Sequence, residues 1–394
     1  MSEAVYIVNC VRTPVGKAGG VFKKVRPDDL LSFVLSSLLK DSPSIDPLTI
    51  DDVIIGCAMP EAEQGLNVAR ISALLANYPH SVPGVTVNRF CASGLQSIAY
   101  AADRIRLGEA DVMVAGGVES MSMIPMMGHH PAFNIKVFKT DNVGLAYGMG
   151  ATAELVAKKY HIDRNSQDRF AFESHLKAIN AVEKNYFKDE IKPYNVITKS
   201  YNLELQKATH QSNIVSMDEG VRFNTSIEQL GKLNPVFNHQ GSVTAGNSSQ
   251  MSDGASAILL CSEKALKRFD LTPIARFVGY AVSGVDPKIM GIGPALAIPK
   301  ILTQCGLKQH DIGHIELNEA FAAQSLAIIR ELKLDPAIVN PLGGAIALGH
   351  PLGATGSIRT TTLLHHLQRT NTRYGMVTMC IGGGMGAAGI FEKL

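Results

Sequence analysis

The same order of local features occurs twice along the chain, and this repeat constrains the fold more than any other property of the sequence. A turn, a helical pattern, an apolar strand pattern and a group of glycines follow one another over residues 91–117 and again over 350–384. Sequence identity between the two segments is barely visible, so the repeat is one of structure. The sequence therefore predicts an α/β protein with a duplicated fold.

A long segment of different character separates the two copies. Before it, strand patterns alternate with helical patterns in the rhythm of βαβ units, at residues 5–8, 30–39, 53–57, 69–76 and 85–87. Within it, a methionine-rich run and charged amphipathic stretches replace that rhythm. We therefore predict an N-terminal half at 1–119 that is completed by about 249–270, an inserted loop domain at 120–248, and a C-terminal half at 271–394.

Composition disfavours several classes of protein. The 394 residues include 37 Lys and Arg against 35 Asp and Glu, giving a formal net charge of +2, and 46% of them are apolar. This balance is typical of a compact globular protein, and with 6% aromatic residues and no Trp it argues against nucleic-acid binding. Since no apolar run approaches a membrane span and the first residues lack a secretory basic region, we expect a cytoplasmic protein.

The six cysteines give no sign of a disulfide framework or of a metal site. None of them are spaced as C-x-x-C, and no nearby Cys and His residues could complete a zinc tetrahedron. Four lie within apolar segments, where a buried core role is expected: Cys10, Cys57, Cys261 and Cys305.

Three glycine-rich runs match nucleotide-binding patterns only loosely. The run at residues 148–153 lacks a clear preceding strand, and the one at 382–387 lies too near the last residue for a βαβ unit. The run at 344–351 has Walker A spacing without the Lys-Ser/Thr pair. We therefore expect no nucleotide-hydrolysis or dinucleotide site.

Cys91 is the strongest candidate nucleophile, because it lies where a strand pattern turns into a helix pattern. The N–H groups and dipole of a helix N-terminus stabilise a thiolate, so we expect a lowered pKa for this thiol. Small neighbours at residues 92–94 leave a path for a substrate. A buried core role is the alternative.

Three further segments carry groups that could serve such a thiol. His350 lies in a turn with glycines on both sides, where an imidazole could act as a base. Cys380 ends an apolar strand and precedes a glycine run, from Gly382 onward, whose N–H groups could form an oxyanion hole. Asn318 follows an apolar run, as either a helix N-cap or a polar group directed at substrate.

Taken together, four motifs resemble those of the thiolases, enzymes that exchange acyl groups between coenzyme A thioesters and a cysteine. They occur in the family's order: NRFCASG at 88–94, NEAF at 318–321, GHP at 349–351 and CIGGG at 380–384. The resemblance covers the whole chain. It implies a five-layered α-β-α-β-α fold of two similar halves with an inserted loop domain, assembled as a homodimer or homotetramer.

The resemblance also implies a role for each motif. Cys91 is similar to the acylated nucleophile, His350 to the base that activates it, and Cys380 to the group that moves the substrate α-proton. Asn318, through a water, and His350 would face the thioester oxygen. The N–H groups of Cys91 and Gly382 would hold the oxyanion of the acyl-enzyme.

Two more residues match positions that contact coenzyme A in thiolases. Arg222 suits a phosphate group, although a solvated surface charge is an equally good interpretation of an arginine there. Ser249 ends the run TAGNSS at 244–249. The resemblance implies coenzyme A and acyl-CoA as substrates, with no permanently bound cofactor, no metal, no nucleic acid and no membrane span.

The expected activity is that of an acetyl-CoA C-acyltransferase that cleaves 3-ketoacyl-CoA in a ping-pong reaction of fatty-acid β-oxidation. The alternative is the biosynthetic condensation of two acetyl-CoA, which uses the same residues. Biosynthetic members of the family have a stretch similar to YHMGxTAE, whose His lines a short acyl pocket. In this chain, Gly148 occupies the position of that His. Two other classes of protein are disfavoured. A ketoacyl-synthase-type enzyme would not need Cys380, and a scaffold without turnover would not need Cys91, His350 and Cys380.

Overall fold

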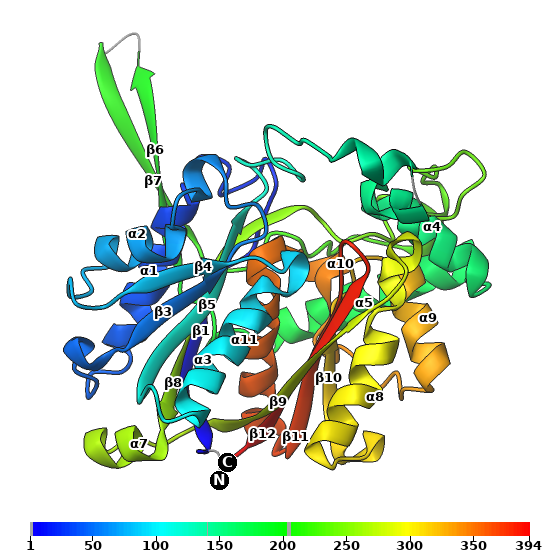
Figure 1. Cartoon of the computed structure of the whole chain (residues 1–394). Coiled ribbons are helices and arrows are strands. Elements are labelled where there is room, and N and C mark those ends of the chain that lie inside the picture. Colours follow the sequence, from blue (N-terminus) through cyan, green and yellow to red (C-terminus); the bar gives the residue numbers. More distant parts are fainter. Residues whose placement is uncertain (1–2, 140, 203–205) are drawn as a thin grey trace.

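Two layers of strands and three layers of helices make up the protein (Figure 1). The computed structural model describes residues 3–139, 141–202 and 206–394. Its main sheet has the strand order β10-β11-β12-β9-β1-β8-β5-β3-β4, with β2 paired to β8. The two halves of this order meet where β1 and β9 pair over only a short stretch, Tyr6 with Arg276 and Ile7 with Ala275. The expected five-layered thiolase-like fold is confirmed.

The strands and helices have the following bounds. The strands are β1 (Val5–Arg12), β2 (Gly16–Lys17), β3 (Asp52–Gly56), β4 (Gly84–Val87), β5 (Val112–Ser120), β6 (Tyr194–Asn202), β7 (Lys207–Val215), β8 (Ser252–Ser262), β9 (Ala275–Gly284), β10 (Ile312–Leu317), β11 (Tyr374–Ile381) and β12 (Met385–Lys393). The α-helices are α1 (Pro27–Lys40), α2 (Val68–Leu75), α3 (Ser93–Arg106), α4 (Met149–Lys159), α5 (Arg164–Glu183), α6 (Ile227–Gly231), α7 (Glu263–Phe269), α8 (Pro294–Cys305), α9 (Ala322–Leu332), α10 (Ala345–Leu348) and α11 (Leu352–Thr370).

A separate apolar core lies between each group of strands and the helices that cover it. Helices α1 and α2 cover the outer face of the β8, β5 and β3 strands, and α8 and α9 cover the outer face of the β9 to β12 group. Helices α3 and α11 lie between the two strand groups and pack against each other. These central helices are the ones that follow Cys91 and His350, so the repeat read from the sequence brings its two copies together at the centre.

Glycines permit the close crossing of α3 and α11. A Cβ at Gly356 would lie 2.5 Å from the backbone nitrogen of Leu95, and one at Gly94 would lie 2.8 Å from that of Ser357. Any larger residue would push the two helices apart. The spacing between the two motif-bearing helices therefore depends on these glycines.

The segment between β5 and β8 lies largely outside this layered body. It contains α4, α5, α6 and the β6–β7 hairpin, which projects away from the sheets in Figure 1. Strand β8 returns to lie between β1 and β5. The boundaries 1–119, 120–248 and 271–394 stay a prediction. In the described ranges, no helix is both long and apolar enough to span a bilayer.

Candidate active site

A short turn places Cys91 between β4 and α3. Strand β4 ends at Val87, the 3₁₀ turn η3 covers Phe90–Ala92, and α3 begins at Ser93. Phe90 has a φ of 43°, in the left-handed region that is costly for a residue with a side chain. The Ser93 hydroxyl fixes the turn, because it accepts from the N–H of Arg89 at 2.8 Å and donates to the carbonyl of Phe90 at 2.7 Å.

The environment of Cys91 keeps its thiol protonated in the resting protein. Burial raises the pKa of Cys91 to about 11, although the N–H groups of Gly382 and of Cys91 itself act to lower it, and the charge of Glu119 adds to the rise. The expectation of a lowered pKa is therefore wrong for this state. Desolvation outweighs the helix terminus, so a separate base must take the proton.

His350 and Asn318 form a buried pair, and Leu352, two residues after His350, belongs to the apolar cluster against which Cys91 packs. The imidazole Nε2 lies 3.3 Å from the Asn318 Nδ2, and Nδ1 lies 2.6 Å from the hydroxyl of Thr355. Because the Thr355 hydroxyl donates to the carbonyl of Pro351 at 3.0 Å, it accepts from Nδ1–H. This assigns the proton to Nδ1, and the lone pair on Nε2 accepts a long hydrogen bond from the Asn318 Nδ2–H. Burial, and then the charge of Arg359, lower the pKa of His350 to about 3.

Asn318 is not a helix cap. The N-cap of α9 is Phe321, and Asn318 lies before it with its side chain fully buried. Within the described part of the chain, no hydrogen-bond partner reaches its Oδ1. Asn318 therefore offers a free acceptor beside His350, and its role as a polar group directed at substrate stays a prediction.

Cys380 and Gly382 reach the same place from the end of β11. Cys380 is buried, and burial together with the neighbouring Cys91 raises the pKa of its thiol far above the ordinary value. Gly383 and Gly384 have φ values of 82° and 84°, which allow the turn into β12. This turn directs the N–H of Gly382 at Cys91.

The structure thus brings together all four motifs that the sequence marked. The η3 turn contacts both α11, which follows His350, and β11, which ends beside Cys380. The backbone N–H of Asn318 donates to the carbonyl of Thr378 on β11 at 2.9 Å. The segments that carry the two thiols, the imidazole, the carboxamide and the Gly382 N–H therefore lie side by side.

Glu119 belongs to this site, although no motif points to it. Its buried carboxylate accepts from the N–H groups of Ala58 at 2.7 Å and of Gly353 at 2.8 Å, and so ties β5 to the N-terminal end of α11. Burial raises the pKa of Glu119 as well. A lone acid at the end of the apolar run 112–118 is the sequence signal that could have found it.

Arg222 and Ser249 lie in two separate loop segments, one before α6 and the other before β8. Arg222 is exposed and lines a cavity of about 510 Å³ that Lys17 of β2 also lines. Ser249 is half-buried, and its N–H donates to the carbonyl of Ala320 beside Asn318. The sequence does not pair Lys17 with Arg222, because only folding brings β2 next to this segment.

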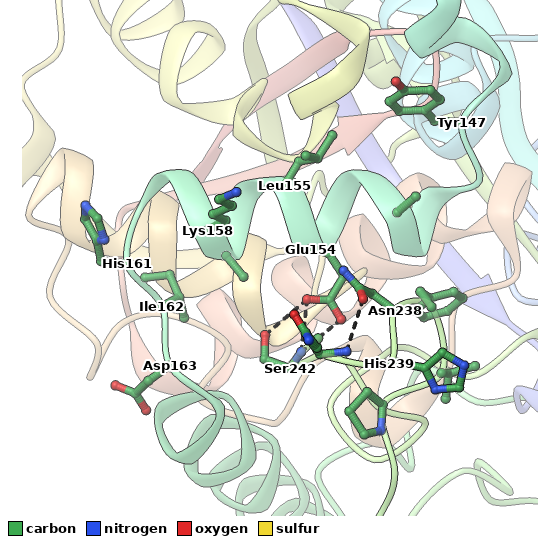
Figure 2. A pocket seen from close by; sticks show the side chains of 17 residues that line it. Tyr147, Glu154, Leu155, Lys158, His161, Ile162, Asp163, Asn238, His239 and Ser242 are labelled. Carbon is green, nitrogen blue, oxygen red and sulfur yellow. Dashed lines mark hydrogen bonds between the residues drawn. The ribbon is translucent and has the colours of Figure 1, made fainter.

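A second, larger cavity of about 990 Å³ lies between α4 and the loop at residues 235–242 (Figure 2). Glu154 of α4 holds this loop by accepting from the N–H groups of Ser242 and Val243 at 2.8–3.0 Å. Gly148 precedes α4, and no described atom lies within 4 Å of where its Cβ would be. This end of α4 therefore has open space.

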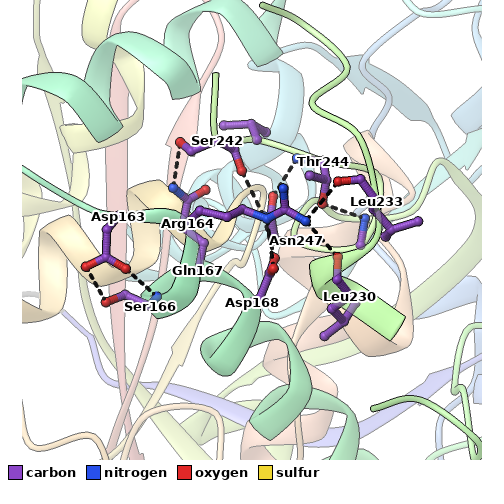
Figure 3. A network of polar contacts seen from close by, with 12 residues as sticks. Asp163, Arg164, Ser166, Gln167, Asp168, Leu230, Leu233, Ser242, Thr244 and Asn247 are labelled. Atoms are coloured by element: carbon purple, nitrogen blue, oxygen red, sulfur yellow. Dashed lines mark hydrogen bonds and ion pairs between the residues drawn. The ribbon is translucent and has the colours of Figure 1, made fainter. Parts of the chain in front are cut away.

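A polar network fixes the segment that leads to Ser249 (Figure 3). Arg164 of α5 pairs with Asp168 at 2.8 Å and donates to the carbonyls of Leu230 and Leu233 at 2.7 and 2.9 Å. Asp168 in turn accepts from the side chain of Asn247 at 2.9 Å. The network anchors residues 230–247 to α5.

Comparison with known families agrees with this geometry along almost the whole chain. Residues 5–264 match the family described as thiolase, N-terminal domain, and residues 271–393 match thiolase, C-terminal domain. The chain belongs to the thiolase family. It is therefore an acyltransferase, as the motifs predicted.

Similar proteins cover the chain from end to end. A protein of Bacillus subtilis named 3-ketoacyl-CoA thiolase is 52% identical over 394 residues, covering 100% of both chains, and one of the same name from Pseudoalteromonas translucida is 46% identical over 98% of each. Two solved thiolase structures match with a TM-score of 0.89 over 100% of this chain and 99% of theirs. They are the Bacillus anthracis acetyl-CoA acetyltransferase at 40% identity and the human mitochondrial 3-ketoacyl-CoA thiolase at 38%.

Proposed function

We propose that the chain is a 3-ketoacyl-CoA thiolase that cleaves its substrate with coenzyme A through an acyl group on Cys91. The observation that carries this proposal is the meeting of the Cys91 thiol, the Gly382 N–H and the Cys380 thiol beside the His350–Asn318 pair. The names of the relatives at 52% and 46% identity support it.

In the first half-reaction, Nε2 of His350 accepts the proton of Cys91. The thiolate attacks the 3-keto carbon, and the N–H groups of Cys91 and Gly382 stabilise the oxyanion that forms. The bond between C2 and C3 then breaks, and the Cys380 thiol donates its proton to the departing enolate of acetyl-CoA. Asn318, through a water that donates to its Oδ1, and His350 face the thioester oxygen of that enolate. Cys91 is left acylated, Cys380 as thiolate and His350 as imidazolium.

In the second half-reaction, coenzyme A releases the shortened acyl group. Cys380 takes the proton from the coenzyme thiol, which attacks the thioester carbonyl on Cys91. The Cys91 thiolate leaves and regains its proton from His350, so both groups return to their starting states. In this scheme coenzyme A and acyl-CoA are substrates, and the enzyme needs neither a metal nor a permanently bound cofactor.

Gly148 supports the degradative direction over the biosynthetic one. The biosynthetic pattern has a histidine at this position, whereas here a Cβ would meet open space. An absent imidazole enlarges and depolarises the wall beside an acyl tail. The substrate we propose is therefore a 3-ketoacyl-CoA of medium chain length.

Two measurements test the function. Incubation with a 3-ketoacyl-CoA should add one acyl mass to the peptide that contains Cys91, and Cys91→Ser should abolish this label whereas Cys305→Ser, on α8, should keep it. The kcat/KM for a medium-chain 3-ketoacyl-CoA should at least equal that for acetoacetyl-CoA. A preference for acetoacetyl-CoA of about tenfold or more, ~1.4 kcal/mol, would favour the biosynthetic alternative.

We further propose that two or four copies assemble and that the enzyme acts in the cytoplasm, in fatty-acid β-oxidation. Arg222 and Lys17, two cationic groups on one cavity, would hold phosphate groups of coenzyme A, and Ser249 would contact the same ligand. Sedimentation analysis of the purified protein measures the number of copies. Loss of coenzyme A affinity in Arg222→Ala measures the phosphate contact.

A further inference from the structure

Two polar stripes run side by side through the middle of the C-terminal half. Residues 314 and 316 of β10 and residue 318 directly after it share one face, since side chains alternate along extended chain. Along α11, residues 355, 359 and 366 share one face, since they are four and seven positions apart. The two elements are in contact, so the stripes can meet.

The residues on the two stripes meet in three successive pairs. Asn318 lies against His350, which Thr355 holds at the start of α11. The next pair is Glu316 with Arg359, whose closest charged atoms are 3.6 Å apart. In the last pair, the rings of His314 and His366 have centroids 4.5 Å apart. We call the six residues of these three pairs the β10–α11 polar column. Thr355 is not one of them.

The middle of the column is a charge pair removed from water. Glu316, Arg359 and His314 are each at most 1% exposed, and the Glu316 carboxylate accepts from Nε2–H of His314 at 2.7 Å. No partner among the described residues forms a hydrogen bond with Nε, Nη1 or Nη2 of Arg359, or with Oε2 of Glu316. A buried ion pair with so few hydrogen bonds costs stability compared with apolar side chains of similar volume. The pair therefore needs a reason other than folding.

The position of the pair supplies that reason. Arg359 lies one helical turn beyond Thr355, which contacts His350, and Glu316, near the end of β10, lies two residues before Asn318. We propose that Arg359 and Glu316 are positioning residues that hold and electrostatically tune the His350–Asn318 pair. The guanidinium disfavours a proton on His350, and the Glu316 carboxylate partly offsets that effect. This proposal rests on the role of His350 as base.

The Cys91 and Cys380 thiols are protonated at rest because burial raises the pKa of each, so the charges near the pair come from β10 and α11. His350 lies against Asn318, which follows β10, and against Thr355 of α11, and the charge of Arg359 acts in the same direction as burial to lower the pKa of His350. Arg359 faces Glu316 on β10. Further along, Glu316 also interacts with His314 and with His366, whose pKa burial lowers to about 4.

Two more carboxylates contact α11, those of Glu119 and Glu190, and each has its own partners. Glu119 accepts from the N–H groups of Ala58 and Gly353. Glu190 accepts from the hydroxyl of Thr362 at 2.8 Å and pairs with Arg12 at 2.6 Å, both within the buried interior. Arg12 in addition binds Asp218. Arg359 is thus the cation on α11 that acts on His350, and Glu316 is the carboxylate that balances it.

The test uses the rate at which iodoacetamide alkylates Cys91 in the full-length protein at neutral pH. Alkylation requires the thiolate, and His350 stabilises the thiolate in proportion to its own affinity for the proton. Arg359→Gln should raise that affinity and speed alkylation severalfold, up to about tenfold for each unit of pKa. Glu316→Gln should have the opposite effect and slow alkylation.

Controls separate this electrostatic role from mere loosening of the fold. Arg359→Lys keeps the charge and should alkylate at the wild-type rate, and the double variant Arg359→Gln, Glu316→Gln should return toward it. If Arg359→Gln does not fold, Arg359→Met replaces it with the same expected direction. Changes of the same sign in both single variants, or no change in either, would overturn the proposal.

Thiolysis gives a second readout that depends on the proposed function. The acid limb of kcat/KM should move to higher pH in Arg359→Gln, because His350 then binds its proton more readily, and should stay in place in Arg359→Lys. A wild-type protein that alkylates normally but lacks thiolysis would refute the function and leave the alkylation test of the charge pair intact.

Discussion

Burial raises the pKa of the Cys91 thiol and hydrogen bonding lowers it, and the effect of burial is the larger. With a pKa of about 11, only a small fraction of the thiol ionises at neutral pH without help. In the mechanism that we propose, His350 supplies that help through Nε2 when substrate arrives. The resting enzyme is therefore protected from unspecific oxidation or alkylation, and its nucleophile forms only in the presence of a base at contact distance.

At the same scale, substitutions at Cys380 and His350 should produce different defects. Cys380→Ser should still acquire the acyl mass on Cys91, slowly, but should lose deuterium exchange at the methyl group of acetyl-CoA, since a hydroxyl is a far weaker acid than a thiol. His350→Ala should slow acylation itself by about 10²–10⁴-fold. Mass spectrometry follows acylation and NMR follows exchange. Normal exchange in Cys380→Ser would remove Cys380 from the role of proton carrier.

At Gly148, the preference for acyl chain length can be tested by adding a side chain rather than by removing one. Gly148→His should lower kcat/KM for a medium-chain 3-ketoacyl-CoA by about tenfold, ~1.4 kcal/mol, and change that for acetoacetyl-CoA much less. Gly148→Ala is the matched control and should behave as wild type, because its Cβ meets open space. Equal losses on both substrates would contradict a role in the acyl pocket.

Among the elements, α5 acts as the anchor of the segment at residues 230–247. Arg164 is its main contact, because one guanidinium reaches the carbonyls of both Leu230 and Leu233. Both residues also line the cavity that contains Arg222. The position of this segment therefore sets the shape of the proposed coenzyme A contact surface.

Arg164→Ala should raise the KM for coenzyme A by about 3- to 10-fold, ~0.7–1.4 kcal/mol, with little change in kcat. The reason is that the loop loses its anchor, whereas the thiols and His350 do not touch Arg164. Steady-state thiolysis at varied coenzyme A measures both constants. Arg330→Ala, which removes an exposed arginine near the same helix, is the control and should leave KM unchanged. A fall in kcat with unchanged KM would contradict the anchoring role.

At the scale of the whole molecule, the site depends on how closely the two halves approach each other. The buried carboxylate of Glu119 and the glycines of the α3–α11 crossing both join them. Gly356 is the tightest of the crossing positions described above, with a backbone nitrogen 2.5 Å from its missing Cβ. A shift of α11 would carry His350 away from Cys91.

Gly356→Ala should therefore destabilise the protein by about 1–3 kcal/mol and lower kcat together with the melting temperature. Gly231→Ala is the matched control: it lies at the end of α6, no described atom lies within 4 Å of its Cβ position, and its effect should stay within about 0.5 kcal/mol. Thermal unfolding and thiolysis rates measure both variants. Similar stability of the two variants would contradict the importance of the crossing.

Local patterns in the sequence determined the elements and the chemistry of the site. The period of apolar residues predicted the helices that became α3 and α11 and the strands that became β5 and β11, and the four motifs predicted which side chains would gather. These signals are visible in a sequence because they depend on neighbours within a few residues. Cys10, Cys57 and Cys261 are buried as expected, whereas Cys305 at the end of α8 is half-buried.

Only the tertiary structure decided the pKa values and the residue pairings that depend on groups far apart in the sequence. The pKa of Cys91 rises rather than falls, because burial by segments far along the chain outweighs the local helix terminus. The meeting of Asn318 with His350, of Glu316 with Arg359, and of Lys17 with Arg222 depends on which strand lies beside which helix. Desolvation and Coulomb interactions are set by distances in space, and a sequence fixes those distances only through the complete fold.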